Sequence, residues 1–162
     1  MRGRGKLTVI LAGIVLAAGA VAVGLATRSQ GPPPPAQVLY GVDDCVECGM
    51  VLTDPRSAAQ MITTDRVVKF CDVGCLVVYQ LRHHPDWKGV RAAYVPDWHT
   101  QQWLDARTAW WVTTHHKTPM LYGLVTLRDR GEAEAMAREH GGRVMTYDEV
   151  AAMDLLREEA RR

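Results

Sequence analysis

The feature that most limits how this chain can fold is a run of twenty residues without a charge, from Leu7 to Ala26. A run of this length can cross a bilayer as a helix. Three basic residues precede it within the first six positions, and a basic start before an apolar run predicts that the chain after it is exported. We expect residues 1–28 to be a membrane anchor or a signal peptide. A single-pass anchor is favoured, because the run exceeds the ~7–15-residue apolar core of a signal peptide.

Four consecutive prolines follow in the segment "RSQGPPPPAQ". Prolines in series hold an extended polyproline conformation, so we interpret residues 29–38 as a linker. Residues 39–162 remain, which is enough for one small domain with a single core. Four of the nineteen basic residues precede position 29, and the rest of the chain holds the other fifteen with all eighteen acidic residues. This slightly acidic balance gives no indication of a nucleic-acid partner.

Short apolar runs alternate with helix-forming segments along residues 58–162. The pattern of strand, strand, helix and strand occurs twice, around residues 58–95 and again around 108–146. It predicts an α+β domain with two such units. The expected strands are residues 58–63, 66–71, 91–97, 108–114, 121–127 and 143–147, the expected helices are residues 72–84, 130–142 and 147–162, and residues 99–107 are expected to be a short helix or turn.

Four cysteines, Cys45, Cys48, Cys71 and Cys75, form two close pairs in the first half of the predicted domain. In an exported protein such pairs are typical of disulfides. A disulfide within either pair would close too short a loop to stabilise the fold much. Pairing between the two groups remains open, and so does a structural zinc site built from all four cysteines.

A thiol–disulfide oxidoreductase using Cys45 and Cys48 is another interpretation of the CxxC motif. Such enzymes place the motif at a helix N-terminus, where the first thiol has a low pKa. Here the motif precedes a turn with a proline, and three acidic residues around it would raise the thiol pKa. Because no serine–histidine, paired-carboxylate or phosphate-binding pattern stands out either, we expect a protein that is not an enzyme.

Methionine and histidine residues are further candidate ligands for a metal ion bound by the cysteines. Met50 follows Cys48 by two positions, and Met120 lies in the loop "TTHHKTPMLYG" with His115 and His116. Cysteine and methionine sulfur select Cu(I), and imidazole also binds copper, whereas zinc sites are built from cysteine and histidine. The alternative to a ligand role is core packing for Met120 and an exposed, solvated position in the loop for the two histidines.

Several motifs, taken in order, resemble the NosL family of extracytoplasmic Cu(I)-binding proteins. They are "CVECGMVL", "FCDVGCLVVY", "AAYVPDW", "TPMLYG" and "GGRVMTYDEV", and they cover nearly the whole predicted domain. The segment from Cys48 to Cys75 also resembles the TRASH/YHS pattern of heavy-metal-associated proteins. Both resemblances point to soft metals.

The NosL resemblance implies a metallochaperone that delivers Cu(I) to a copper enzyme, most often nitrous oxide reductase, on the periplasmic side of the membrane. A membrane transporter complex is a second implied partner. Cys48 and Met120 match the family's copper ligands, and Met50, Cys45, Cys71, Cys75 and His116 are further candidates. This chain departs from the family pattern in carrying Cys71 where relatives often have an acidic residue, and in having an apolar run where many relatives have a lipid-attachment cysteine.

Overall fold

The structure is a computed structural model and describes residues 31–162. The predicted anchor, Leu7 to Ala26, lies outside these residues. Within the described part of the chain, no helix combines the length and the hydrophobicity that crossing a membrane requires.

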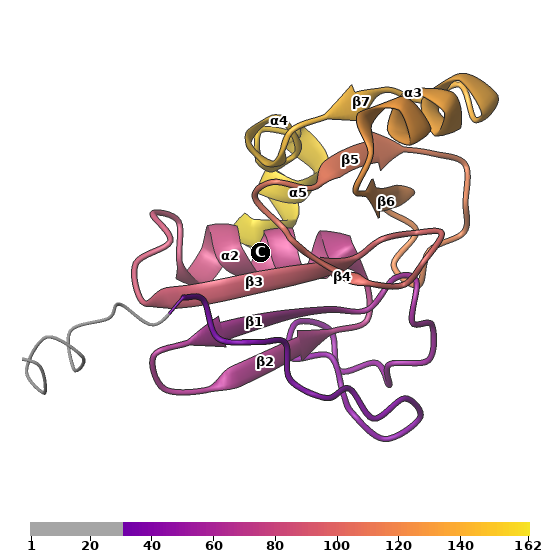
Figure 1. Cartoon of the computed structure of the whole chain (residues 1–162). Coiled ribbons are helices and arrows are strands. Elements are labelled where there is room, and N and C mark those ends of the chain that lie inside the picture. Colours follow the sequence, from indigo (N-terminus) through magenta and orange to yellow (C-terminus); the bar gives the residue numbers. More distant parts are fainter. Residues whose placement is uncertain (1–30) are drawn as a thin grey trace, which may run out of the picture. The chain divides into compact units, whose positions relative to one another are not determined.

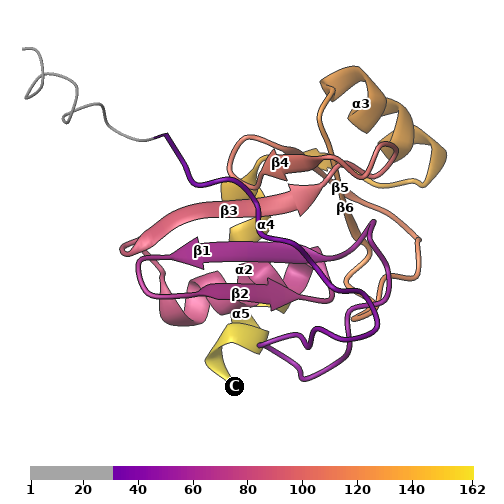
Figure 2. The same cartoon turned by 60° about the horizontal axis from the view of Figure 1, so that its bottom comes forward.

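An antiparallel sheet organises the first half of the described chain. Its strands are β1 (Ala59–Thr63), β2 (Val67–Phe70), β3 (Val90–Pro96) and β4 (Trp103–Asp105), in the order β2-β1-β3-β4. The helix α2 (Val73–His83) lies across one face of this sheet (Figures 1 and 2). Every residue of β1 is buried, which requires cover on both faces of the sheet, since successive side chains of a strand point to opposite faces.

A second antiparallel sheet repeats the arrangement with fewer residues. Its strands are β5 (Trp110–Thr113), β6 (Leu124–Leu127) and β7 (Val144–Met145), in the order β6-β5-β7, and the helix α3 (Arg130–Glu139) packs against it. In both sheets the first strand of the unit lies between the other two. The predicted α+β class and the two strand–strand–helix–strand units are therefore confirmed.

Two segments differ from the prediction. Residues 103–105, expected to be helix or turn, form β4, because Leu104 pairs with Val95 of the neighbouring strand β3. The predicted terminal helix is two helices, α4 (Tyr147–Ala151) and α5 (Asp154–Arg161), because Met153 between them has extended backbone angles. The break lets α5 turn and pack against α2.

The last residues of the predicted linker contact the domain. The hydroxyl of Tyr94 in β3 donates to the carbonyl of Pro33 at 2.6 Å. Gln60 in β1 exchanges two hydrogen bonds with the backbone of Ala36, of 2.7 and 3.1 Å. This extended segment therefore runs across β1 and β3 before it reaches residue 39 (Figure 2).

The larger of two core clusters in residues 31–162 contains residues of both units, which Tyr147 helps to connect, and a smaller cluster lies between α3 and its sheet. The Tyr147 ring packs edge-on against Trp111 of β5, and its hydroxyl donates to Oε1 of Gln80 in α2 at 2.8 Å. Gln80 is buried, and its amide nitrogen donates to the carbonyl of His84. The hydrogen bond between Tyr147 and Gln80 thus joins the first turn of α4 to the C-terminal half of α2.

We expect Tyr147→Phe to lower the free energy of unfolding by about 1–3 kcal/mol, since it leaves Oε1 of Gln80 buried without a donor. Urea denaturation measures the change. Tyr40→Phe is the control, because Tyr40 is exposed and its change should stay within about 0.5 kcal/mol. Equal stability of the Tyr147→Phe and parent proteins would show that the buried pair contributes nothing.

Candidate metal centre

A tight turn from Cys45 to Gly49 carries the first two cysteines. The amide of Gly49 donates to the carbonyl of Cys45, and the amide of Cys45 donates to the carbonyl of Met50, both at 2.8 Å. Gly49 has a φ of +76°, a conformation that glycine adopts without strain. The turn is tied to β2 by the amide of Val46, which donates to the carbonyl of Lys69.

The other two cysteines flank the start of α2. Cys71 directly follows β2, and Cys75 lies in the first turn of the helix. Asp72 between them is the N-cap residue, and its side chain accepts a hydrogen bond from the amide of Gly74. Because strand and helix are both packed in the core, these two thiols have fixed positions.

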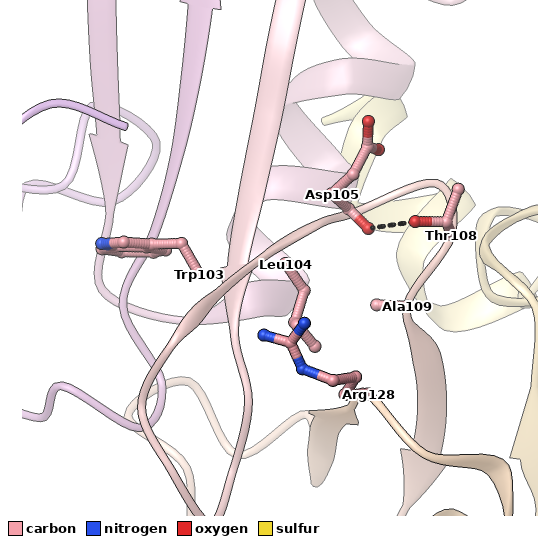
Figure 3. A pocket seen from close by; sticks show the side chains of 6 residues that line it. All are labelled: Trp103, Leu104, Asp105, Thr108, Ala109 and Arg128. Atoms are coloured by element: carbon pink, nitrogen blue, oxygen red, sulfur yellow. Dashed lines mark hydrogen bonds between the residues drawn. The ribbon is translucent and has the colours of Figure 1, made fainter. Parts of the chain in front are cut away.

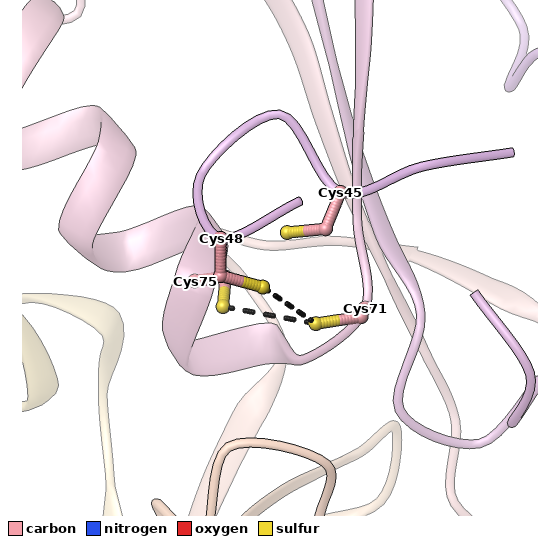
Figure 4. Close-up of side chains that lie close together, drawn as sticks. All are labelled: Cys45, Cys48, Cys71 and Cys75. Carbon is pink, nitrogen blue, oxygen red and sulfur yellow. Dashed lines mark hydrogen bonds between the residues drawn. The ribbon is translucent and has the colours of Figure 1, made fainter. Parts of the chain in front are cut away.

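The four thiols converge on one point. The Sγ of Cys71 lies 3.4 Å from that of Cys48 and 4.0 Å from that of Cys75, and all four sulfur atoms lie within 4.8 Å of one another. Figure 4 shows the side chains pointing toward this common centre from the turn and from the helix. Cys45, Cys71 and Cys75 are buried, whereas Cys48 is half-buried. All four are free thiols.

This spacing suits a single metal ion. A metal with sulfur ligands at about 2.3 Å in tetrahedral geometry requires sulfur–sulfur distances of about 3.8 Å. The observed separations of 3.4 and 4.0 Å lie on either side of this value. The cluster can therefore enclose an ion once the side chains adjust, because all four sulfur atoms lie within 4.8 Å of one another. Cys48 is the ligand that solvent reaches.

The thiols also influence one another's protonation. The pKa of Cys45 is held far below its usual range by hydrogen bonds from Cys71 and Cys75, and backbone amides of Cys71 and Cys48 add to the effect. The pKa of Cys71 and of Cys75 is raised, in each case chiefly by the interaction with Cys45. Because a metal ion binds thiolates and not thiols, metal binding to this cluster releases protons.

Met120 lies at the same end of α2. Its amide donates to Oδ2 of Asp72 at 3.0 Å, and its half-buried side chain packs against the core that contains Cys45, Cys71 and Cys75. The β5–β6 loop therefore carries the backbone of Met120 to the N-terminal end of α2, the end of the helix where Cys71 and Cys75 lie. Nothing in the sequence indicated that Asp72 would bond to a residue 48 positions away.

Met50 and His116 are placed differently. Met50 is 44% exposed, and its carbonyl accepts a hydrogen bond from the amide of Cys45. The His116 ring packs between Trp98 and His140, at centroid distances of 4.7 and 4.3 Å. Burial and the neighbouring His140 lower the pKa of His116. Within residues 31–162, the group of potential ligands around the cysteines contains no histidine.

An ion pair fixes the turn from outside. Arg82 of α2 is paired with Glu47, which lies between the two cysteines of the turn. The same guanidinium donates to the carbonyls of Glu159 and Ala160 at the end of α5. The C-terminal helix is thereby connected to the CxxC turn through one arginine.

A hollow of about 240 Å³ lies elsewhere, between β4 and the residue that follows β6 (Figure 3). Its charged groups are already paired, because Asp105 bonds Arg107 and Arg128 bonds Gln102. It contains none of the cysteines and no residue of the Met120 loop, so it offers no second route to the cluster. Its lining residues are Trp103, Leu104, Asp105, Thr108, Ala109 and Arg128.

The fold and the cluster define a small α+β protein with a candidate sulfur-only metal centre. A family model described as NosL matches residues 37–155, and the chain belongs to this family. It is 30% identical over 151 residues to the copper-binding lipoprotein NosL of Stutzerimonas stutzeri, an alignment that covers 86% of this chain and 78% of that protein. The crystal structure of the copper chaperone NosL from Shewanella denitrificans matches with a TM-score of 0.64 and 26% identity, covering 73% of this chain and 96% of that one.

Proposed function

We propose that this protein binds Cu(I) at the four-cysteine cluster and transfers it to a copper-accepting protein. The observation that carries the proposal is the convergence of four free thiols within 4.8 Å, three of them buried and one half-buried. Thiolates are soft ligands that favour Cu(I), although they also bind Zn(II). The half-buried Cys48 gives the ion one accessible side, as transfer requires.

The names of the two relatives, a copper-binding lipoprotein and a copper chaperone, support the proposal that the metal is copper and that it is passed to another protein. We propose nitrous oxide reductase or a similar copper enzyme as the acceptor, with a membrane transporter complex as a further partner. Cys48 and Met120 are the proposed exchange ligands, and Cys45, Cys71 and Cys75 complete the sulfur surroundings. Met50, at the surface beside Cys48, is suited to a first contact with arriving copper, and the placement of His116 favours a packing role. The proposed role is binding and transfer, without catalytic turnover.

A structural zinc site is the second candidate, because the all-cysteine geometry would also suit tetrahedral Zn(II). Competition between the two metals decides between them. We expect sub-nanomolar Cu(I) binding and displacement of Zn(II) by equimolar Cu(I), measured anaerobically with a Cu(I)-specific chelator as reference. Zn(II) that stays bound under these conditions would establish the zinc site instead.

The location of the described domain is also proposed. The charge asymmetry around Leu7 to Ala26 and the lipoprotein relative support an extracytoplasmic domain tethered to the membrane by a single helix. We expect protease added to spheroplasts to remove an epitope tag placed after Arg162. A tag that survives until the inner membrane is lysed would place the domain in the cytoplasm.

The oxidoreductase alternative gains no support from the geometry. Cys45 and Cys48 lie in a turn, and the cysteine in the first turn of a helix is Cys75, which is fully buried. A reactive thiol needs both a helix N-terminus or similar positive surroundings and access to its substrate. Neither pair of cysteines combines a helix N-terminus or similar positive surroundings with access to a substrate.

A further inference from the structure

Asp72 is a buried carboxylate that joins two parts of the proposed copper site. It is completely buried, and each of its oxygens has a separate partner. Oδ1 accepts from the amide of Gly74 at 2.8 Å, which caps α2, whereas Oδ2 accepts from the amide of Met120 at 3.0 Å. One oxygen thus belongs to the helix that carries Cys75 and the other to the loop that carries Met120.

The loop around Met120 depends on this end of the helix for its position. A Cβ atom at Gly74 would lie 2.3 Å from the ring of Tyr122, so the tyrosine packs directly on the glycine. Leu121, which lies between Met120 and Tyr122, has a φ of +60°, a conformation that is strained for a leucine. Strain of this kind persists only where surrounding contacts impose it. Here the hydrogen bond from Met120 to Asp72 and the packing of Tyr122 on Gly74 are the contacts that hold the loop in this conformation.

We propose that Asp72 is a positioning residue that holds the Met120 loop against the cysteine cluster and thereby sets how fast copper is released. The inference rests on the proposed function. When the bond from Met120 to Asp72 is present, the loop stays at the end of α2 that carries Cys75, where the Met120 thioether is available to the copper ion. When the bond opens, the loop moves away and the thioether leaves with it. Asp72 therefore acts through Met120, and touches neither the metal nor the acceptor.

Asp72→Asn tests this selectively. The amide oxygen of asparagine can still accept from Gly74 and cap the helix, but its NH₂ group cannot accept from the amide of Met120. We expect Cu(I) transfer from the loaded protein to a chelator to become about tenfold faster, the effect of losing one hydrogen bond to a charged group. Thermal melts of the metal-free proteins establish that the variant is folded.

Asp97→Asn is the matched control. Asp97 is also buried and also divides its oxygens, since Oδ1 accepts from amides of its own turn and Oδ2 accepts from the amide of Arg128 at 2.9 Å. Asp97 bridges two segments just as Asp72 does, but neither of these segments carries a proposed copper ligand. We expect this variant to lose stability while it releases copper at the parent rate.

A double-mutant cycle with Met120→Leu separates positioning from general destabilisation. Leucine conserves the volume of Met120 but removes its sulfur. If Asp72 acts through Met120, then Asp72→Asn will not accelerate release further in the Met120→Leu background. Release at the parent rate in Asp72→Asn, or equal acceleration in both backgrounds, would overturn the inference. A parent protein that retains no Cu(I) would overturn the proposed function together with the inference, and this failure is recognised before any variant is compared.

Discussion

Cys48→Ser is expected to weaken Cu(I) binding by at least about a thousandfold, equivalent to roughly 4 kcal/mol. The substitution replaces a thiolate, which Cu(I) prefers, by a hydroxyl that binds it poorly. Cys48 is half-buried, so serine fits at this position with little change in packing. Competition with a Cu(I) chelator under anaerobic conditions gives the affinity of both proteins.

Val46→Ser is the matched control, because Val46 lies in the same turn, is 45% exposed and supplies no ligand. Its copper affinity should stay within a few-fold of the parent value. Cys71→Ser extends the test, since Cys71 lies 3.4 Å from Cys48 and belongs to the proposed cluster. A Cys71→Ser protein with the parent affinity would show that Cys71 is not a copper ligand.

Copper loading is expected to stabilise the fold by about 4 kcal/mol when the free Cu(I) concentration is a thousand times the dissociation constant. The ligands come from the 45–49 turn, the end of β2 and the start of α2, and unfolding separates all three. The native state therefore binds the ion far better than the unfolded chain does. Urea denaturation with chelator-buffered Cu(I) measures the increase in the free energy of unfolding.

The same titration on Cys48→Ser supplies the control for stabilisation by copper. Its metal-free stability should equal that of the parent, but added Cu(I) should leave it nearly unchanged. If copper stabilises both proteins equally, the ion binds elsewhere on the chain, and the four-thiol site is not where the cargo is held.

Much of the fold follows from local patterns in the sequence. The alternation of strand and helix signals predicted both units, because each element buries one apolar face and has a recognisable period. The strand β4 was not predicted, since Trp103–Asp105 is short and is held by its pairing with β3. The break before α5 was not predicted either, because no glycine or proline marks Met153.

The sequence predicted a sulfur-rich centre, but it did not predict the contacts that support the cysteines and the Met120 loop. Two cysteine pairs with soft-metal neighbours indicated a sulfur-rich centre, and the structure does bring all four thiols together. Sequence proximity to Met120 made His116 a candidate, but its ring packs against Trp98 and His140. The bond from Met120 to Asp72 and the pairing of Glu47 with Arg82 depend on tertiary contacts, which spacing along the chain does not reveal.

X-ray absorption spectroscopy of the anaerobically Cu(I)-loaded protein, together with metal analysis, tests the central claim most directly. The four-cysteine cluster predicts one copper ion per chain with only sulfur neighbours, at distances of about 2.2–2.3 Å, and loss of this signal in Cys48→Ser. Nitrogen or oxygen neighbours in the first shell, or a loaded protein without stoichiometric copper, would contradict it.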